Sequence, residues 1–391
     1  MRLAWFRPAP VEGQEESDHL AAVIAGLRGA HAINVVSERD AHDFVWQHAR
    51  GMFDLCVYEL DNTLRHQYMW PYLLHYPGVL ALQSATVHDS RRARLVHEGR
   101  LADYATEILF AGGPKHVRPP WHMARGVWPM LRVPVTASRL TAVADPALAE
   151  SIGTSLPEAR VRLLDVGVPA PRTAATPAHQ PPAPIVVAVV EPARAEVVAR
   201  AIGRVRADGL LLESHVASAR DVPSADVVVA VRWPLHGAPL MSALSGMAAA
   251  RPVVVAETST TAAWAALDPQ TWRTRDVGRG DTPIVVSIDP RDEEHSLVLA
   301  LRRLATDAAL RADLGGAARD WWASHATLDH AVSSWQSVLE LGLALPSPPR
   351  PDGWPPHLDA DGSALARTLL AECGIDDDVI RRVPMGSPAP S

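Results

Sequence analysis

This chain of 391 residues contains little cysteine, and its two cysteines lie far apart in the sequence. They are Cys56 and Cys373, so the sequence holds neither a disulfide framework nor a cysteine-based zinc motif. Cys56 lies within the apolar run FDLCVYEL, which indicates a core residue, with a reactive thiol as the alternative. This cysteine usage is typical of a reducing compartment.

Long hydrophobic runs are also absent. No stretch of about 18 apolar residues is available to span a bilayer. The amino-terminal MRLAWFRPAP is too short an apolar run for a signal peptide. We therefore expect a soluble, cytoplasmic protein, and this reasoning leaves peripheral contact with the inner face of a membrane open.

Lysine is almost absent, so arginine carries nearly all of the positive charge. The formal net charge of -7 argues against general affinity for nucleic acids, because such binding needs many Lys and Arg contacts to phosphates. A small anionic ligand needs only a local cluster and is not excluded. The hydrophobic fraction is sufficient for globular cores. The length predicts two domains, because single cores stop growing near about 250–300 residues.

The first half of the chain alternates between strand and helix patterns. The expected strands are Met1–Phe6, Ile33–Val36, Leu55–Leu60, Val79–Leu82, Val133–Ala137 and Val161–Leu164. The expected helices are Asp18–Leu27, Ala41–Ala49, His66–Leu74, Arg91–Phe110 and Ala142–Ile152. Such alternation predicts an α/β fold with a parallel sheet.

A proline-rich segment, Pro169–Pro184, is typical of a linker, and the alternation restarts after it. The expected strands are Ile185–Val190, Gly209–Leu212, Asp226–Val231, Val253–Ala256 and Ile284–Ile288. The expected helices are Arg194–Val205, Leu240–Ala250, Glu293–Thr306, Asp307–His325 and Leu328–Leu345. We expect domains at 1–168 and 185–345, a linker at 169–184, and a proline-rich and helical tail at 346–391.

Residues 230–254, AVRWPLHGAPLMSALSGMAAARPVV, carry the clearest functional signal. A buried strand continues through Arg232-Trp-Pro and a turn at Gly237 into a helix rich in small residues. The segment resembles the donor-sugar site of retaining family 4 glycosyltransferases, which have two Rossmann-like domains facing across a cleft (GT-B). In that family a Gly-Glu turn opens a helix that faces the nucleotide diphosphate. Here Ala238 replaces the Glu, and Ser245 replaces a second acidic residue.

Three further passages are similar to the same family. Tyr58–Leu95 matches its pattern at Asn62, His66, Pro77, Gly78 and His88, whereas Gln83, Ser84 and Asp89 stand where relatives carry His, Asp and often His. Val161–Pro171 is similar to the end of the first domain, and Leu310–Trp335 to the terminal helices. The resemblance covers about Met1 to Leu345 and implies degenerate acidic and histidine motifs.

A nucleotide-sugar donor presents a diphosphate, and a helix N-terminus offers N–H groups and a favourable dipole to such an anion. Arg232 is expected to contact the phosphates in bidentate fashion, with simple pairing on a surface loop as the alternative. Arg194 resembles the basic residue that relatives aim at the same phosphates, although VVEPAR is shorter than their glycine-rich connection. The remaining candidates around this helix start are His236, Gly237, Ala238, Pro239, Ser242 and Ser245.

In the first domain, His66, His88 and Gln83 are the candidates for catalytic positions, with Asn62 as a further site candidate. In relatives, the histidine at the position of Gln83 would contact donor sugar or acceptor. A glutamine there can hydrogen-bond but cannot titrate near pH 7. His66 precedes Trp70 by four residues, so interface packing is its alternative. No histidines have ligand spacing, and we expect no metal.

The leading hypothesis is a retaining, hexosyltransferase-type glycosyltransferase that moves a sugar from a nucleotide-sugar donor to a glycan, lipid-linked or small-molecule acceptor. It needs no cofactor besides the donor, which is a substrate. The first alternative is a catalytically inactive GT-B protein that binds or scaffolds in glycan assembly. The second is another nucleotide-sugar enzyme of the same architecture, such as an epimerase. The basic, aromatic loop Lys115–Trp128 leaves acceptor sugar, anionic lipid and ordinary packing open.

Overall fold

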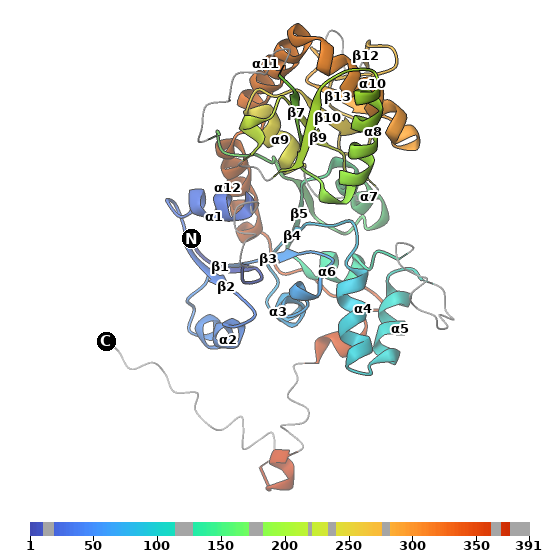
Figure 1. The fold of residues 1–391 in the computed structure, drawn as a ribbon. Helices are drawn as coiled ribbons and strands as arrows, with labels where there is room; N and C mark the ends of the chain where they lie inside the picture. Colours follow the sequence, from blue (N-terminus) through green and yellow to red (C-terminus); the bar gives the residue numbers. More distant parts are fainter. Residues whose placement is uncertain are drawn as a thin grey trace.

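The structure is a computed structural model that describes residues 1–10, 19–113, 128–171, 183–217, 221–233, 240–275, 282–360 and 369–375. It contains two predominantly parallel β-sheets, one of six strands and one of seven, each with helices around it (Figure 1). Buried apolar residues form a separate cluster on each face of each sheet. The predicted α/β fold with two Rossmann-like units is confirmed.

The first sheet has the strand order β2-β1-β3-β4-β5-β6, and all of its pairings are parallel. Its strands are β1 (Arg2–Phe6), β2 (Ala32–Val36), β3 (Leu55–Leu60), β4 (Val79–Leu82), β5 (Leu140–Val143) and β6 (Val161–Leu163). The central strands β3 and β4 are buried at every position. This burial agrees with their continuous apolar runs, because a parallel sheet is covered on both faces.

Helices cover both faces of this sheet. They are α1 (His19–Leu27), α2 (Ala41–Ala49), α3 (Met69–His75), α4 (His88–His97), α5 (Leu101–Phe110), α6 (Arg132–Ala137) and α7 (Pro146–Ser155), with a 3₁₀ turn η2 (Leu64–His66). Successive side chains of β1 point to opposite faces of the sheet, as in any strand, and so pack in two different hydrophobic clusters. Ala4 and Phe6 pack in the cluster with α2 and α3, and Leu3 and Trp5 pack in the cluster with α1.

The second sheet has the order β12-β11-β13-β10-β9-β7-β8, with only the β11–β12 pair antiparallel. Its strands are β7 (Ile185–Val189), β8 (Leu212–Val216), β9 (Val227–Ala230), β10 (Val253–Ala256), β11 (Ala266–Leu267), β12 (Thr274–Arg275) and β13 (Val285–Ile288). The helices around it are α8 (Ala195–Ala207), α9 (Met241–Ala248), α10 (Glu293–Thr306) and α11 (Ala308–His325). Short 3₁₀ turns are η4 (Pro192–Arg194), η5 (Val222–Ser224) and η6 (Pro290–Asp292).

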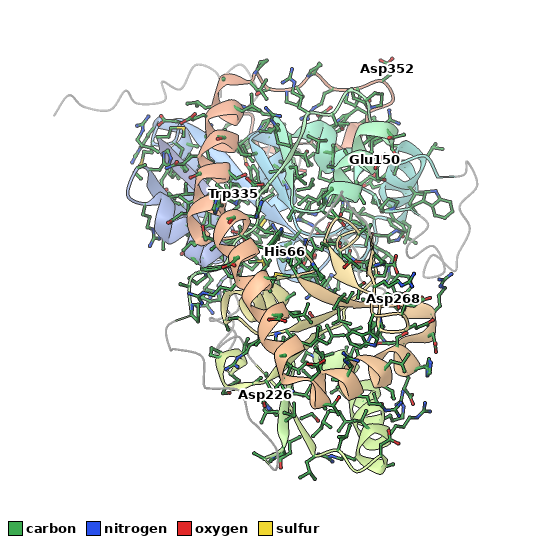
Figure 2. All side chains as sticks on the ribbon, turned by 90° about the horizontal axis from the view of Figure 1, so that it is seen from above. His66, Glu150, Asp226, Asp268, Trp335 and Asp352 are labelled. Carbon is green, nitrogen blue, oxygen red and sulfur yellow. The ribbon has the colours of Figure 1, made fainter. Side chains whose placement is uncertain are left out.

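The last long helix, α12 (Leu328–Ala344), returns to the first sheet. Trp335 of α12, labelled in Figure 2, is 2% exposed. It packs against Trp5 of β1, with ring centroids 4.9 Å apart. The two chain segments that cross between the domains pass close to each other at Gly167 and Thr327. A Cβ on Gly167 would lie 2.0 Å from the carbonyl oxygen of Thr327. The predicted domain limits stay predictions, but this helix from the predicted second domain completes a core of the first.

Beyond α12 the chain crosses the first domain as a strap, which we define as residues 346–360. Its 3₁₀ turn η7 (Pro356–Asp359) places Leu358, 3% exposed, in the core beside α3. Trp354 meets Phe110 edge to face at 5.6 Å. Arg350 donates to the carbonyl of Leu74 at 2.7 Å. Part of the predicted tail is therefore an integral piece of the first domain.

Several sequence predictions of elements need correction. Residues Val133–Ala137 are not a strand but most of helix α6, because Pro134 lies in its first turn, where a missing N–H costs no helical hydrogen bond. The strand follows it, as β5. Ala142 and Val143 belong to that strand, so the predicted helix Ala142–Ile152 begins only at Pro146, as α7. The predicted single helix Arg91–Phe110 is two helices, separated at Gly99 by a left-handed backbone (φ +70°). The predicted strand at Gly209–Leu212 begins only at Leu212, after Gly209 turns with φ +85°.

Other predictions agree with the structure to within a few residues. Strands β3, β4 and β10 and helix α10 have the predicted limits, and α12 ends one residue early. The linker is described only at its two ends, since residues 172–182 lie outside the described part. Of the predicted terminal helical unit Ser363–Val383, only 369–375 is described.

Candidate functional site

The carboxyl ends of the two sheets face each other. Asp145 follows β5 of the first sheet, and Thr260 follows β10 of the second. The hydroxyl of Thr260 donates to Oδ2 of Asp145 at 3.3 Å. Asp145 is 3% exposed, and its other oxygen accepts the Ala147 N–H at 2.9 Å, capping α7. Groups that follow strands of both sheets therefore lie along one interface.

In the second sheet, the strand order reverses between β7 and β9. The chain runs from β7 to β8 on one side and then continues with β9 on the other side of β7. Parallel α/β sheets bind ligands at such a reversal, outside the carboxyl ends of the strands. Glu191 follows β7 by two residues, and Arg232 follows β9 by two. This reversal is the candidate ligand site.

Arg232 follows β9, and a carboxylate lies beside it, while its predicted role in phosphate binding stays a prediction. Its Nε is 3.3 Å from Oε1 of Glu191, and the two side chains are 25% and 13% exposed. The same Glu191 oxygen accepts from the hydroxyl of Ser242 on α9 at 3.5 Å. Ser242 therefore lies beside Glu191, and its predicted site role stays a prediction. Sequence reasoning missed Glu191, although its place directly after a buried strand was a usable signal.

Arg194 reaches the same site from the start of α8. One of its terminal nitrogens lies 3.4 Å from Oε2 of Glu293, and the other donates to the carbonyl of Trp233. The fold therefore brings the two predicted arginines together, at the ends of neighbouring strands. Each arginine is paired with a glutamate, so these four side chains carry balanced charge.

The turn before α9 lies outside the described residues. This concerns the predicted positions His236, Gly237, Ala238 and Pro239, whose roles stay predictions. Ser245, one turn into α9, donates to the carbonyl of Met241 at 3.0 Å. A serine in a helix commonly makes this back-bond, and its predicted site role stays a prediction.

The first sheet reverses its strand order between β1 and β3. Glu59, near the end of β3, is 5% exposed and accepts from the Trp5 indole at 2.6 Å. Arg7, which directly follows β1, lies 3.8 Å from the same oxygen. Sequence reasoning missed this acidic and basic pair, although a glutamate inside an apolar strand indicates a special environment.

Asn62 holds the beginning of α4. Its Oδ1 accepts from the backbone N–H groups of Asp89 and Ser90 at 2.8 and 3.3 Å. Its Nδ2 donates to the Asp89 carboxylate at 3.2 Å. The predicted residue therefore satisfies helix N–H groups from a distant loop, which is a capping role.

His66 lies in η2, with Nδ1 2.8 Å from the Thr63 hydroxyl. Burial lowers its pKa below the ordinary 6.5, while the charge of Asp61 opposes that shift. The imidazole is therefore mostly neutral at pH 7 and is able to accept a proton. Figure 2 shows His66 near the middle of the molecule, between the two domains. Its predicted role stays a prediction that this chemistry permits.

His88 is 1% exposed and engaged at both ring nitrogens. Nδ1 donates to the carbonyl of Trp128 at 2.7 Å, and Nε2 lies 2.7 Å from the Tyr104 hydroxyl. These contacts fasten α4 to α5 and to the segment before α6. The environment is structural and does not favour the predicted catalytic role.

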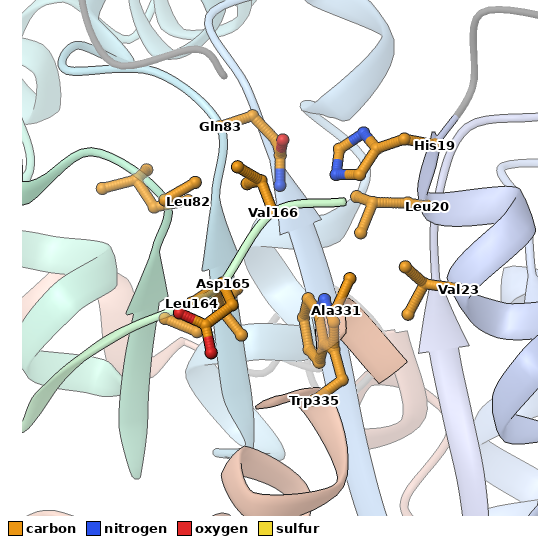
Figure 3. A pocket seen from close by; sticks show the side chains of 12 residues that line it. His19, Leu20, Val23, Leu82, Gln83, Leu164, Asp165, Val166, Ala331 and Trp335 are labelled. Carbon is orange, nitrogen blue, oxygen red and sulfur yellow. The ribbon is translucent and has the colours of Figure 1, made fainter. Parts of the chain in front are cut away.

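Gln83 lines a small cavity at the end of β4, opposite His19 (Figure 3). The cavity has a volume of about 10 Å³, which is near the room that a single water needs. Its wall includes Leu82, Asp165 and Trp335. Gln83 therefore lies at the carboxyl end of β4, but this cavity is too small for a sugar, and the predicted role of Gln83 stays a prediction.

Among the described residues, no helix is both long and apolar enough to cross a membrane. No group of three or more His, Cys, Asp or Glu side chains in the same ranges is arranged to hold a metal ion.

No protein-family model and no curated protein sequence matches this chain. Solved structures with a similar course of chain include a glycosyltransferase from Rickettsia africae ESF-5, at 9% identity over 87% of this chain and 98% of that one (TM-score 0.46). WaaG, a glycosyltransferase involved in lipopolysaccharide biosynthesis, is 10% identical over 87% and 99% (TM-score 0.49). A putative UDP-N-acetylglucosamine 2-epimerase from Listeria monocytogenes is 8% identical over 89% and 98% (TM-score 0.47). Likenesses at such identities concern the fold alone.

Proposed function

We propose that this protein is a glycosyltransferase that takes a sugar from a nucleotide-sugar donor and passes it to a glycan or lipid-linked acceptor. The donor would bind at the reversal of the second sheet, and the acceptor would approach from the first. The donor serves as substrate, and the proposal requires no further cofactor or metal.

One observation carries the proposal. Arg194 and Arg232 come from separate parts of the sequence and lie together where the second sheet reverses its strand order. Sugar transfer from a nucleotide releases a diphosphate, and cationic groups at that leaving group stabilise its developing charge. Two guanidinium groups are suited to this task because they bind phosphate oxygens in pairs.

The first domain would supply the opposite wall. The neutral imidazole of His66 is suited to accept a proton from an acceptor hydroxyl. Glu59 and Arg7, at the reversal of the first sheet, are further polar groups on that side. Retention of anomeric configuration and a hexose as the transferred sugar are proposed from the sequence resemblance only.

The proposal is tested with a panel of UDP-, GDP-, ADP- and TDP-sugars. Binding of one class should raise the melting temperature, because a ligand that binds the folded state stabilises it with the logarithm of its concentration over Kd. Turnover is then measured by chromatography as the release of free nucleoside diphosphate, with and without glycan acceptors. A panel without any binder, on protein shown to be folded, would reject the proposal.

The first site prediction concerns Arg232. Arg232→Ala should weaken nucleoside-diphosphate binding by about 1.5–3 kcal/mol, the scale of a charge-assisted hydrogen bond. Calorimetry measures the change, and Arg291→Ala, an exposed arginine after β13, serves as the matched control. Equal affinity of Arg232→Ala and wild type would remove Arg232 from the site.

A second function is favoured by Gln83 and by the glutamate that accompanies each arginine. A glutamine cannot replace a titrating histidine, and paired arginines attract phosphate less strongly. Both features fit a GT-B protein that binds a nucleotide sugar or glycan without turnover. Binding of a panel member with no release of diphosphate, even with acceptors, would favour this function over transfer.

A further inference from the structure

The carboxylate of Glu191 lies at the point where a donor phosphate would have to approach Arg232. We propose that Glu191 selects by charge at this site: it weakens binding of the free nucleoside diphosphate more than binding of the nucleotide sugar. This inference rests on the proposed function and adds to it a device for product release.

The geometry makes Glu191 a neighbour of any anion that Arg232 binds. One Glu191 oxygen is 3.3 Å from Arg232 Nε and 3.5 Å from the hydroxyl of Ser242. Its side chain is 13% exposed, so protein surrounds most of the charge. Groups after β7, after β9 and on α9 therefore meet at this one oxygen.

The turn after β7 offers few backbone N–H groups to offset the negative charge of Glu191. In dinucleotide-binding folds, a glycine-rich turn at the equivalent place offers backbone N–H groups to phosphates. Here the sequence is Val190-Glu191-Pro192-Ala193-Arg194, without any glycine. Pro192 opens η4 and has no N–H to donate. Backbone donors that would offset the Glu191 charge are reduced accordingly.

The nucleotide sugar and the free nucleoside diphosphate differ in the charge of their terminal phosphate. A nucleotide sugar carries two negative charges on its diphosphate diester. In the free nucleoside diphosphate the terminal phosphate titrates with a second pKa near about 6, so it carries close to one additional charge at pH 7.5. Repulsion by a carboxylate a few ångströms away is therefore larger for the product than for the donor.

Glu191 is a positioning and selecting residue, since it also holds the guanidinium of Arg232. In the donor complex, Arg232 shifts part of its interaction from Glu191 to the diphosphate. After transfer, the new charge on the terminal phosphate meets Glu191, and the product leaves more readily.

The test compares wild type, Glu191→Gln and Glu191→Asp by calorimetry. Ligands are the best-binding nucleotide sugar of the panel and its matching free diphosphate. Glu191→Gln keeps a hydrogen-bond acceptor for Ser242 but removes the charge. We expect it to tighten diphosphate binding by about tenfold and sugar-nucleotide binding by clearly less, from the Coulomb energy at such distances. Glu191→Asp, which keeps a carboxylate, should retain the wild-type ratio of the two affinities.

Glu196→Gln is the matched control. Glu196 is exposed in the first turn of α8, so this substitution removes one carboxylate charge near the site without touching Arg232. It should leave the affinity ratio unchanged. An unchanged ratio in Glu191→Gln, or equal weakening of both ligands, overturns the inference while the proposed function stands. Absence of binding by the folded wild type to every panel member overturns the proposed function itself. Melting temperatures establish that each variant is folded.

Discussion

Glu107 of α5 has no exposed side-chain surface, yet it lies among groups that favour its charged form. Arg91 donates to one oxygen at 2.7 Å through Nε, and His357 of the strap contacts the other at 2.7 Å. Burial raises the pKa of Glu107, but the hydrogen bonds and charges of Arg91 and His357 outweigh it, so the pKa falls below the ordinary 4.5. The carboxylate thus joins α4, α5 and the strap.

This arrangement predicts a dependence of stability on pH. A group whose folded-state pKa is depressed contributes stability above its unfolded pKa and loses it as pH falls through the folded pKa. We expect the free energy of unfolding of wild type to decrease as pH drops below about 4.5. Glu107→Gln should cost about 3–5 kcal/mol near pH 7, because it leaves Arg91 buried without its charge partner. The free energy of unfolding of Glu107→Gln should fall less steeply with decreasing pH than that of wild type. Urea titrations at several pH values measure both, and the same pH dependence in the two proteins would contradict the assignment.

Gly167 gives a second prediction at this scale. A Cβ there would lie 2.0 Å from the Thr327 carbonyl oxygen, so backbone would have to move at the crossing between the domains. Gly167→Ala should therefore destabilise the protein by about 2–3 kcal/mol. Gly316→Ala is the control, because a Cβ at Gly316 in α11 would meet nothing within 4 Å. It should be neutral or stabilising, since alanine is the better helix former by about 1 kcal/mol. Equal effects in thermal unfolding would reject the close approach.

At the scale of elements, the strap shows what pattern reading can and cannot find. Its proline density predicts a break, and this is correct for secondary structure. The side chains of Trp354, His357 and Leu358 nevertheless pack on distant partners. Such contacts depend on where the chain returns in space, which no local period encodes.

The strands and helices themselves were largely predictable, because buried strands and amphipathic helices have distinct periods. The failures have local causes. The β-branched residues of Val133–Ala137 favour a strand, but Pro134 suits the first turn of a helix. In the site, Arg194 and Arg232 were predicted from motif and strand ends. Glu191 was missed, because its pairing with Arg232 arises only when β7 and β9 become neighbours.

Leu358 provides the test of the strap. Leu358→Ala removes a side chain that is 3% exposed in the first-domain core, so the free energy of unfolding should fall by about 2–4 kcal/mol. Leu369→Ala, at a position 53% exposed, should change it by less than about 0.5 kcal/mol. Chemical denaturation measures both. Equal stability of the two variants would mean that the strap does not pack on the core in solution.

On the scale of the whole molecule, two segments connect the domains, and a side-chain hydrogen bond between Thr260 and Asp145 spans their facing edges. Near the crossings, the N–H of Val168 donates to the carbonyl of Ala326 at 3.0 Å. Farther along the interface, Thr260 donates to Asp145. The first contact is backbone and fixed by close packing, whereas the second is a single exchangeable bond between side chains.

Thr260→Val should therefore shift the arrangement of the domains and leave each of them folded. Loss of one hydrogen bond of net worth about 1 kcal/mol changes an open-to-closed ratio by about fivefold. Fluorescence transfer between dyes on the two domains measures that ratio. Thr154→Val, at an exposed site on α7, is the control and should have no effect. An unchanged ratio in Thr260→Val would show that this bond does not hold the domains together.

The return of α12 to the first sheet also affects how the protein is made. The apolar face of β1 that holds Leu3 and Trp5 is completed by Trp335 and Leu339, which are synthesised more than three hundred residues later. While the second domain is still emerging from the ribosome, this face lacks the helix that covers it. Exposed apolar surface of that kind promotes aggregation in partly folded chains. The nascent chain therefore passes through a long interval in which a chaperone has a surface to bind, and that interval ends only when α12 is released.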